Sequence, residues 1–546
     1  MAHVTGSSLA YAHPGGDLLF CDVSFHVAPG DHVGVVGANG VGKTTLFRVL
    51  TGELPADEGE FTVGGRVAYM PQNVGVGDDG RTVRELLTAL APSVLRSAGE
   101  RMLAAERALA AGDDQAGIDL GTAIGEWSGL GGYELEGQWD AACRRIVRSS
   151  FAELADRPAV TLSGGERKRL VLDVVFASDA EVLLLDEPDN FLDVPAKREL
   201  ERQIASSRKT ILLISHDRDL LASAVRSILT LEGNGAWMHP GSYTSYPRAR
   251  EERQRKLGDA VKRWKAEERR LFHLMKTFKE RARYADGWAK KADAAETRWR
   301  RFADAGPPPA PVTDQQIKMR IRGGDSARLA LVVKALGIGE LVKPFSDEIH
   351  FGERVAVVGP NGGGKTQLMR TFAGEHGVAR RGEVRVGNRV SIGHFTQLNV
   401  RGDFSGRQVL DVVIGRVPGM ERAMAALARY GLAVAAQRQY DVLSGGQKAR
   451  LEILCLELDG HNLLLLDEPT DNLDIDSAEA LEAALEGFEG TVVAVSHDRA
   501  FLRRMDRFLM VLHDGTVLAL PDFESMINAL VEPEAAPQVR LAKMLT

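Results

Sequence analysis

The sequence has only three cysteines and no long hydrophobic run. Cys21, Cys143 and Cys455 lie far apart without a CxxC pair, which argues against a disulfide framework, a zinc site or an iron–sulfur cluster. The longest apolar runs, such as residues 182–185, have the length of a strand, and none approaches the roughly 20 residues that cross a bilayer. The first residues also lack the basic and apolar regions of a secretory signal. We therefore expect a cytoplasmic protein with reduced thiols, no metal cluster and no membrane segment.

The chain of 546 residues is too long for a single hydrophobic core, so we expect two or more domains. Its net charge of −7 is unevenly distributed. Residues 247–302 contain 19 Lys and Arg against 9 Asp and Glu, an excess of +10, so the rest of the chain carries −17. A basic block on an acidic body indicates a polyanionic partner, although such a block can also be a solvated helix face.

One set of motifs occurs twice. The first set is GANGVGKT at 37–44, LSGGE at 162–166, VLLLDE at 182–187 and SHD at 215–217. The second set is GPNGGGKT at 359–366, LSGGQ at 443–447, LLLLDE at 463–468 and SHD at 496–498. The glycine-rich loops are 322 residues apart, whereas the later motifs are 281 apart. The spacing from Gln72 to Ser163 is 91 positions, against 47 from Gln397 to Ser444, so the first copy holds roughly 44 additional residues, which fall within about 92–143.

Each copy has the pattern of alternating strands and helices. The runs 33–36 and 355–358 predict short strands that enter a glycine-rich turn, and 182–185 and 463–466 predict buried parallel strands. This order predicts an α/β domain in each copy. We place the domain boundaries at 1–246 (with the insertion at about 92–143), 247–322 for a basic linker, 323–520 for the second copy and 521–546 for a short tail.

The linker is polar and nearly free of turn residues up to Phe302. It predicts one helix from about Arg248 to Tyr284 and an antiparallel second one from about Trp288 to Phe302. Apolar residues at mostly helical spacing would form a narrow seam between them: Leu257, Val261, Trp264, Leu271, Met275 and Phe278. The interleaved aromatic residues could stack on bases or pack the hairpin, and packing is favoured. A proline-rich run at 306–311 then stops the helix.

The GxxxxGK[ST] (Walker A) loop follows a strand and opens a helix in both copies. Its glycines let backbone N–H groups wrap phosphates, Lys43 and Lys365 add a positive charge, and Thr44 and Thr366 can ligate Mg²⁺. The LSGG sequences have the small-residue form of a helix N-terminus, whose dipole and N–H groups favour an anion. A Ser-Gly-Gly sequence alone is a common linker fragment, so this interpretation depends on the complete set.

Carboxylates follow the buried strands. Asp186 and Asp467 end these strands, where a lone carboxylate is costly unless it meets a cation, and Mg²⁺ would supply one. Glu187 and Glu468 come next and are placed to polarise an attacking water, although an acid at a strand end can also be a helix cap. The histidines and glutamines that follow other apolar strands complete the set: His216 and His497 could reach a γ-phosphate or orient water, and Gln72 and Gln397 could ligate Mg²⁺.

Together these motifs resemble the ATP-binding cassette superfamily. The duplicated cassette, the insertion in the first copy and the basic linker resemble the ABC-F family over essentially the whole chain. The resemblance implies two P-loop cassettes that close head to tail within a monomer, ATP and Mg²⁺ as cofactors, and ATP hydrolysis. It also implies an insertion that acts as an arm. The linker is implied to be a hairpin that enters the tRNA exit site of the ribosome, contacts rRNA and tRNA, and so modulates translation or protects against antibiotics.

The resemblance places one ATP between each Walker A loop and the LSGG sequence of the other copy. The expected nucleotide-binding residues are Tyr11, Gly37, Asn39, Gly40, Gly42, Lys43, Thr44, Thr45, Ser163, Gly164, Gly165, Gly359, Asn361, Gly362, Gly364, Lys365, Thr366, Gln367, Ser444, Gly445 and Gly446. The expected catalytic residues are Glu187, Glu468, His216 and His497; the expected metal ligands are Thr44, Gln72, Asp186, Thr366, Gln397 and Asp467. The cations expected to contact RNA are Arg281, Arg283, Lys290 and Lys291.

The sequence departs from the family pattern at two places. Tyr11 is the plausible base-stacking aromatic of the first copy, but the corresponding stretch 333–336 of the second copy has no aromatic. The D-loops, residues 189–193 and 470–474, carry Phe191 and Asn472 where the family commonly has His. Both glutamates and both histidines are retained, so we expect two hydrolysis-competent sites that are not equivalent.

Two other classes compete with this hypothesis. The ATP-binding subunit of a drug exporter would need a surface groove for its membrane partner and no basic hairpin. A DNA-repair or chromosome ATPase would carry zinc cysteines or a long coiled coil within a cassette, and neither occurs in the sequence. Within the ABC-F hypothesis the turn at about 283–290 is short, which favours a housekeeping translation factor over a resistance protein.

Overall fold

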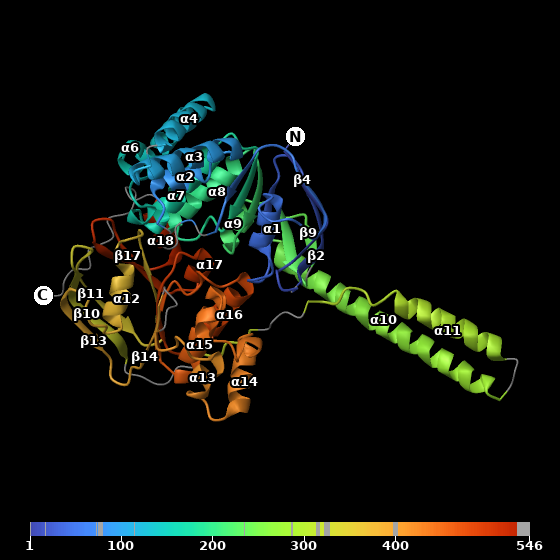
Figure 1. Ribbon diagram of the computed structural model, residues 1–546. Helices are drawn as coiled ribbons and strands as arrows, with labels where there is room; N and C mark the ends of the chain where they lie inside the picture. Colours follow the sequence, from blue (N-terminus) through green and yellow to red (C-terminus); the bar gives the residue numbers. More distant parts are fainter. Residues whose placement is uncertain are drawn as a thin grey trace.

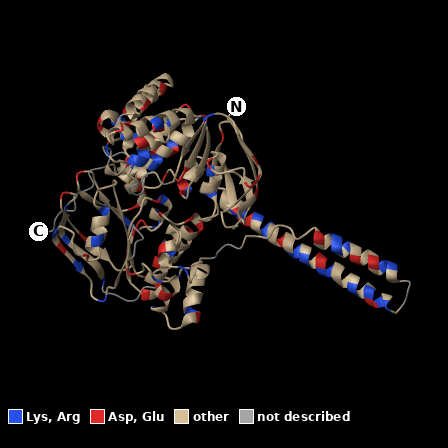
Figure 2. Cartoon of the chain, in the orientation of Figure 1, with Lys and Arg blue, Asp and Glu red and all other residues tan. Residues whose placement is uncertain are grey.

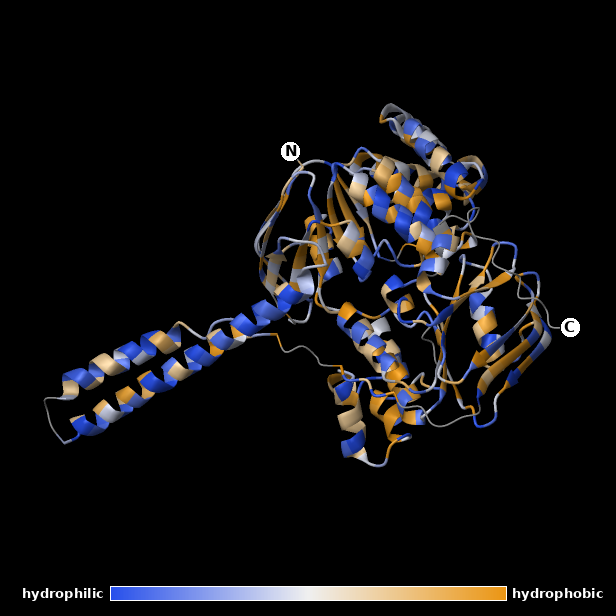
Figure 3. Cartoon of the chain, turned by 180° about the vertical axis from the view of Figure 1, so that it is seen from behind, coloured by the Kyte–Doolittle hydropathy of each residue, from blue (hydrophilic) through white to orange (hydrophobic). Residues whose placement is uncertain are grey.

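The computed structural model describes residues 2–16, 18–72, 74, 80–113, 115–233, 235–284, 288–312, 317–321, 328–396 and 402–531. Two α/β cassettes lie against each other and form the body of the molecule, and two long helices project from it as a hairpin (Figure 1). Hydrophobic residues occur on both strands and helices of the body, whereas the hairpin is largely hydrophilic with interspersed apolar residues (Figure 3).

The first cassette is built on a six-stranded sheet of described residues. Its strand order is β5 (Val67–Met70), β6 (Val182–Asp186), β7 (Thr210–Ile214), β3 (His32–Val36), β8 (Ser227–Glu232) and β9 (Gly235–His239). All neighbouring pairs are parallel except β8 and β9. Strands β3, β6 and β7 are buried along their whole length, which explains their continuous apolar runs. The predicted buried parallel strands are thereby confirmed.

A smaller antiparallel sheet and several helices complete the first cassette. The sheet has the order β2 (Leu18–Val27), β1 (Val4–Ala12) and β4 (Glu58–Val63). The helices are α1 (Lys43–Leu50), α2 (Val83–Thr88), α6 (Phe151–Leu154), α7 (Gly164–Ala177), α8 (Val194–Ser206) and α9 (Arg218–Ser223).

The inserted segment is helical throughout most of its length. It forms α3 (Ser93–Ala110), α4 (Ala116–Gly129) and α5 (Gly132–Ile146). Trp127 and Trp139 are fully buried with ring centroids 6.1 Å apart. A Cβ atom at Gly132 would come within 2.2 Å of the Trp127 ring, so this close approach requires glycine. Packing around the two tryptophans therefore accounts for a helical insertion in a glycine-rich stretch.

The second cassette repeats this architecture. Its larger sheet has the order β14 (Ile392–Phe395), β15 (Leu463–Asp467), β16 (Thr491–Val495), β12 (Arg354–Val358), β17 (Arg507–Val511) and β18 (Val517–Leu520). Its smaller sheet has the order β11 (Val342–His350), β10 (Leu329–Ile338) and β13 (Arg380–Val386). The helices are α12 (Lys365–Phe372), α13 (Val409–Ile414), α14 (Met420–Arg429), α15 (Gly445–Asp459), α16 (Ile475–Glu486), α17 (Arg499–Leu502) and α18 (Phe523–Val531).

Helix α18 lies in the segment that the sequence predicts as a tail. Met526 is fully buried, and Ile527 and Ala529 are nearly so, because the helix packs against β17 of its own cassette and α8 of the other. Residues 523–531 thus belong to the folded body, and the rest of the expected tail, 532–546, lies outside the described residues.

The hairpin consists of α10 (Tyr246–Ala282) and α11 (Ala289–Asp304), within two residues of the predicted bounds. Three aromatic pairs join the two helices: Trp264 with Phe302, Phe272 with Trp299, and Phe278 with Trp288, at centroid distances of 5.5, 5.5 and 5.6 Å. These contacts confirm that these six aromatic residues pack the hairpin. Residues 285–287 of the turn between the helices lie outside the described residues. No described helix is both long and apolar enough to span a bilayer.

Candidate active sites between the two cassettes

Each Walker A loop connects a central strand to the helix behind it. Gly37 and Gly359 have φ angles of 154° and 145°, and a Cβ atom at either would lie within 2.4 Å of a backbone oxygen. Glycine is therefore required where the chain leaves the strand. Lys43 donates hydrogen bonds through Nζ to the carbonyl oxygens of Gly37 (2.7 Å) and Ala38 (3.2 Å), and Lys365 does the same in the second loop. The ammonium groups are thus held inside the loops, where phosphates would bind.

The remaining Walker A residues follow the same geometry in both copies. Gly40, Gly42, Gly362 and Gly364 all have positive φ angles. Gly42 and Gly364 precede α1 and α12, so Lys43, Thr44, Thr45, Lys365, Thr366 and Gln367 lie in the first turn of these helices. A glycine-rich turn that leads directly into a helix N-terminus is typical of a phosphate-binding loop.

Glu187 and Glu468 occupy strained backbone positions directly after β6 and β15. Their φ angles are 48° and 50°, in the left-handed region that non-glycine residues rarely adopt. Both backbone N–H groups are held by the neighbouring strand, since Glu187 donates to Ile214 O and Glu468 to Val495 O, each at 2.9 Å. The turn directs each glutamate away from the course of its strand, and such strain is typical of functional positions.

The adjacent aspartates are buried without sufficient partners. Neither Oδ1 nor Oδ2 of Asp186 accepts a hydrogen bond from a described residue. The same holds for Oδ1 of Asp467. Burial raises the pKa of Asp186 to about 7, against the opposing effect of the nearby Thr44 hydroxyl. Burial also raises the pKa of Asp467, and Thr366 lies beside it in the same way. Two buried carboxylates, each next to a threonine hydroxyl, are a donor set that fits Mg²⁺.

Each expected catalytic histidine lies beside its glutamate. The Nε2 atom of His216 is 3.9 Å from Oε1 of Glu187, and that of His497 is 3.6 Å from Oε1 of Glu468. The backbone N–H of His497 also donates to Glu468 Oε2 at 3.1 Å. Burial lowers the pKa of His216 to about 3 and, with the positive charge of Lys365, holds the pKa of His497 well below its ordinary value. Both imidazoles are therefore neutral at physiological pH.

Ser163 and Ser444 cap the helices that begin with the LSGG glycines. The hydroxyl of Ser163 accepts from the backbone N–H of Glu166, and Ser444 accepts from Gln447, which completes a capping box in each copy. Gly164, Gly165, Gly445 and Gly446 form the first turns of α7 and α15. The predicted helix N-termini are confirmed.

One candidate site is a cavity of about 380 Å³ between the cassettes. The first cassette contributes Ser163, Gly164 and Gly165, and the second contributes Asn361, Gly362, Gly364, Lys365, Thr366, Gln367, Asp467, Glu468 and His497. The side chain of Asn361 donates to the carbonyl oxygen of Phe191 in the opposite D-loop at 2.7 Å. The structure therefore brings Walker A of the second cassette and LSGG of the first to one site, which we name the second site.

The first site combines the other halves. The side chain of Asn39 donates to the carbonyl oxygen of Asn472 at 3.2 Å, and its backbone N–H donates to Asp474 Oδ2 at 3.2 Å. A Cβ atom at Gly446 would lie 2.8 Å from the Asn39 side chain, which shows how closely the two motifs approach. The two cassettes are thus arranged head to tail.

Two expected residues need a correction or a limit. Tyr11 is only 8% exposed, and its ring packs against Phe20 in the core with a centroid distance of 6.2 Å, so the structure does not support a base-stacking role. Ser8 has a φ angle of 47° and the pairing of β1 shifts register around Tyr11, so the strand does not keep a simple alternation of faces. Gln72 lines a cavity together with Thr44, whereas Gln397 lies outside the described residues.

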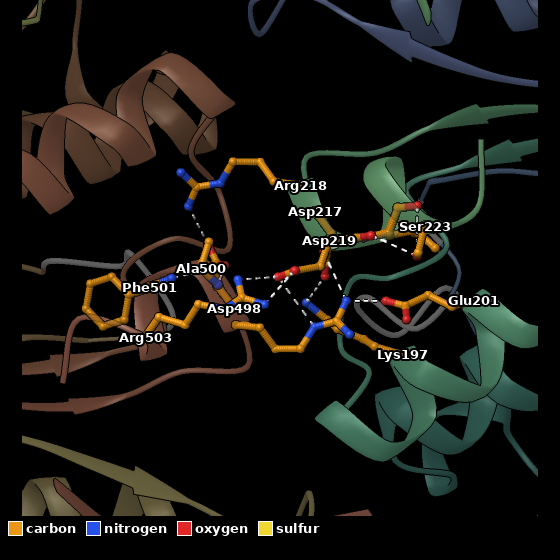
Figure 4. A network of polar contacts seen from close by, with 12 residues as sticks. Lys197, Glu201, Asp217, Arg218, Asp219, Ser223, Asp498, Ala500, Phe501 and Arg503 are labelled. Atoms are coloured by element: carbon orange, nitrogen blue, oxygen red, sulfur yellow. Dashed lines mark hydrogen bonds and ion pairs between the residues drawn. The ribbon is translucent and has the colours of Figure 1, made fainter. Parts of the chain in front are cut away.

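Figure 4 shows polar contacts across the cassette interface, where the structure contains ion pairs that the sequence analysis does not predict. Arg218 of the first cassette binds both carboxylate oxygens of Glu482 in the second, and Arg499 of the second binds Glu201 of the first. Arg503 also binds Asp219 at 2.7 Å. Both Arg218 and Arg499, and both glutamates, are related by the repeat distance of 281, and this shared spacing is the signal that could have identified them.

Comparisons with known proteins agree with this architecture. A family model described as ABC transporter matches residues 20–190 and 342–471. An antibiotic resistance protein of Mycobacteroides abscessus is 42% identical over 545 residues, which are 95% of this chain and 98% of the relative. The tylosin resistance ATP-binding protein TlrC of Streptomyces fradiae is 32% identical, with 92% and 95% covered. The energy-dependent translational throttle protein EttA of Mycobacterium tuberculosis is 30% identical, with 90% and 88% covered. The chain belongs to the ABC-F family.

The ABC-F assignment makes the protein an ATP hydrolase with two nucleotide-binding cassettes. Among solved structures, an RNase-L inhibitor aligns with this ABC-F protein over 96% of the chain and 93% of that structure, with a TM-score of 0.60 and 18% identity. The archaeal recycling factor aABCE1, in complex with a ribosomal stalk protein, aligns similarly with a TM-score of 0.61 and 18% identity. At this level of identity the likeness shows that the two-cassette fold is shared.

Proposed function

We propose that this ABC-F protein binds the ribosome near the tRNA exit site through its hairpin, that ATP closes the two cassettes, and that hydrolysis releases them. Through this cycle it modulates translation, with protection against a ribosome-targeting antibiotic as the preferred outcome. Such a role places it in the cytoplasm as a monomer, since both halves of each ATP site come from one chain.

The main support for ribosome binding comes from the basic end of the hairpin. Arg281, Arg283, Lys290 and Lys291 are all exposed on either side of the turn. Arg281 and Lys291 lie over the ring of Trp288, with distances of 5.0 and 4.5 Å to its centroid, which holds these two charges at the end of the hairpin. Lys and Arg occur along both helices up to the end that is most distant from the body, with Asp and Glu between them (Figure 2). An extended basic rod of this kind fits a phosphate backbone.

The base of the hairpin is linked to the cassette interface. Arg250 of α10 lies 3.3 Å from Glu232 of the first cassette and 3.1 Å from Asp476 of the second. Movement of one cassette relative to the other would therefore change the support of α10. This contact provides a route by which ATP-dependent closure sets the direction of the hairpin.

At each site we propose that the aspartate and the Walker A threonine hold Mg²⁺ together with nucleotide phosphates. Within the described residues no group of three or more His, Cys, Asp or Glu side chains is arranged to hold a metal, so the phosphates would complete the coordination. Mg²⁺ would neutralise phosphate charge. Glu187 and Glu468 would accept a hydrogen bond from the attacking water, and the neutral His216 and His497 would orient the γ-phosphate.

The relatives favour protection over general translation control. The two with the higher identities, 42% and 32%, carry resistance names, whereas the translational throttle protein is 30% identical. The short turn of the hairpin pointed to a housekeeping factor, but length is only one feature of the tip. Susceptibility to a ribosome-targeting antibiotic, measured with and without expression of the protein, separates the two outcomes.

The drug-exporter hypothesis retains one supporting observation. A surface cavity of about 1060 Å³ lies beside Thr44, Gln72 and the start of α3, where a membrane partner could dock. The exporter hypothesis gives no role to a hairpin of 37 and 16 helical residues with a basic end. We therefore prefer the ribosome, and binding to isolated membranes is the comparison that tests the exporter.

The central experiment is ribosome co-sedimentation with ATP. The double variant Glu187→Gln/Glu468→Gln should bind ATP, fail to hydrolyse it and remain on ribosomes. Sedimentation free of ribosomes with ATP present would contradict the proposal.

Charge reversal at Arg281, Arg283, Lys290 and Lys291 in the Glu187→Gln/Glu468→Gln variant should weaken its binding to ribosomes and leave ATP binding intact. A matched control reverses four exposed cations of the body, which are 57% to 64% exposed: Arg66, Arg144, Lys343 and Arg385. Equal loss in both variants would show a general charge effect and remove the hairpin from the account.

A further inference from the structure

The repeat makes residues of the two cassettes comparable one by one. From the LSGG sequence to the SHD sequence each residue of the first cassette has its counterpart 281 positions later. Part of the interface follows this symmetry, as Arg218 and Arg499 or Glu201 and Glu482 show. Lys197 departs from it because its counterpart is Ala478.

Lys197 is a buried cation between carboxylates of both cassettes. It lies on α8, its side chain is 10% exposed, and its Nζ is 3.1 Å from Oδ2 of Asp217. Asp189 of its own D-loop also faces it, and Asp471 and Asp498 face it from the second cassette. Burial lowers the pKa of Lys197, but these four carboxylates outweigh burial and hold it above its ordinary value. The lysine is therefore charged.

Two arginines share this cluster in a symmetric manner. Arg499 lies 3.5 Å from Asp217, and Arg218 lies 3.6 Å from Asp498, but each also binds a glutamate of the opposite cassette. The carboxylates of the cluster repel one another across the interface, since like charges at short range disfavour ionisation. Lys197 is an asymmetric cation in this arrangement, and one aspartate of each D-loop, Asp189 and Asp471, faces it.

Lys197 also lines the second site. The 380 Å³ cavity contains Lys197 and both D-loop aspartates, Asp189 and Asp471, beside Lys365 and Glu468 of the other cassette. A residue of the first cassette thus reaches the Walker A and carboxylate groups of the second. At the first site the equivalent position is the methyl group of Ala478, which is 6% exposed and carries no charge.

We propose that Lys197 is a trans-acting positioning residue for the second site: it joins the D-loops 189–193 and 470–474 and thereby holds Glu468 in place for turnover. The inference rests on the proposed catalytic role of Glu468. It makes the two sites unequal in a defined direction, because the second site depends on a cation that the first site lacks.

Single-site backgrounds test this directly. Glu187→Gln leaves the second site, and Glu468→Gln leaves the first. Lys197→Met should lower kcat at least tenfold in the Glu187→Gln background, with KM for ATP changed less than twofold, and should change kcat less than twofold in the Glu468→Gln background. Lys197→Arg should retain most of the activity in both. Equal losses in the two backgrounds, or no loss in either, would overturn the proposal.

Three further variants control for charge, position on the helix and folding. Lys197→Ala/Ala478→Lys keeps the cation at the interface but moves it to the opposite helix, so it should not restore kcat in the Glu187→Gln background; restoration would show that any cation suffices and would contradict a positioning role. Arg202→Met, at a 72% exposed position of the same helix, should have no effect. If Lys197→Met does not fold, Lys197→Gln, which keeps a donor for Asp217, carries the same comparison.

The double variant Glu187→Gln/Glu468→Gln distinguishes a failure of the proposed catalytic glutamates from a failure of the inference on Lys197. Residual ATP hydrolysis in it would contradict the proposed catalytic glutamates, and the inference on Lys197 would fall with them. If the double variant is inactive and Lys197→Met affects both single-site backgrounds equally, only the inference on Lys197 fails.

Discussion

Arg218 and Glu482, which are 264 residues apart, form a bidentate ion pair across the cassette interface. The carboxylate of Glu482 is fully buried, and the arginine side chain is 13% exposed. Arg499 and Glu201 form the equivalent pair at the position related by the repeat. Each pair joins the helix after an SHD sequence to the helix after the opposite D-loop. The two pairs therefore connect the parts of each cassette that contact the ATP sites.

A double-mutant cycle should reveal this connection. Among the described residues, Arg218→Met leaves Glu482 paired with Arg504 alone, 3.1 Å away, so a buried carboxylate loses its better partner. Breaking such a pair costs about 3–5 kcal/mol. We expect ATPase activity to fall at least tenfold in Arg218→Met and in Glu482→Met, but by less than the product of the two effects in the double variant. Multiplicative losses, or an equal loss in the exposed control Arg202→Met, would contradict the connection.

Lys168 is a second lysine that the other cassette lacks, since its counterpart is Ala449. The side chain is fully buried, and its Nζ has no hydrogen-bond partner among the described residues. Burial lowers its pKa to about 8, although Asp189 and Glu187 attract the charge. Between this value and the unfolded pKa of about 10.4, the unfolded chain binds more protons at this position, so the free energy of unfolding rises with pH in that range.

Lys168→Met should therefore stabilise the nucleotide-free protein most below pH 8, where the buried ammonium is fully charged. We expect the free energy of unfolding to rise by on the order of 1–3 kcal/mol at pH 7.5. The advantage should shrink by pH 9.5. Thermal unfolding at the two pH values measures this, with the 82% exposed Lys262→Met as control. An advantage that does not depend on pH would show that the charge of Lys168 has no part in it.

The elements of this fold could be predicted from the sequence where local signals are strong. The apolar runs before the Walker A loops became β3 and β12, and the Ser-Gly-Gly sequences became capped helices. The contacts of the D-loops and the ion pairs could not be predicted from the sequence, because the head-to-tail packing of two cassettes that are distant in the chain decides which residues meet. The burial of Tyr11 could not be predicted either, because the bulged strand β1 does not keep a regular alternation of buried and exposed faces.

The burial of Lys197 had no sequence signal of its own. A lysine on a helix is normally solvated, whereas Lys197 is buried on α8 among carboxylates of both cassettes. Comparison of the two copies position by position would have marked Lys197 and Lys168 as asymmetric, but not their surroundings. The repeat therefore predicts the symmetric part of the sites, and the structure is needed for their differences.

In the hairpin, packing between the helices and the proposed binding to RNA involve different aromatic residues. Trp264 stacks on Phe302 with a centroid distance of 5.5 Å, whereas Tyr284 beside the turn is 90% exposed. Trp264→Ala should loosen the helix pair and raise its hydrogen-exchange rate, because the two rings lose their contact. Tyr284→Ala should leave exchange unchanged but weaken ribosome binding by about 1 kcal/mol, the lower range for a base-stacking contact. Unchanged ribosome binding would show that Tyr284 contacts no base.

The side chains of the Walker A asparagines join each Walker A loop to the opposite D-loop. Asn361 donates to Phe191 O at 2.7 Å, and Asn39 donates to Asn472 O at 3.2 Å. Replacing either by alanine removes one hydrogen bond across the interface, a net loss of about 0.5–1.5 kcal/mol. We expect ATPase activity to fall roughly two- to tenfold in each variant, with the larger loss for Asn361→Ala because its bond is shorter. Steady-state ATPase assays in the Glu187→Gln and Glu468→Gln backgrounds assign each loss to a site. A loss for Asn361→Ala confined to the Glu468→Gln background would contradict the assignment of Asn361 to the second site.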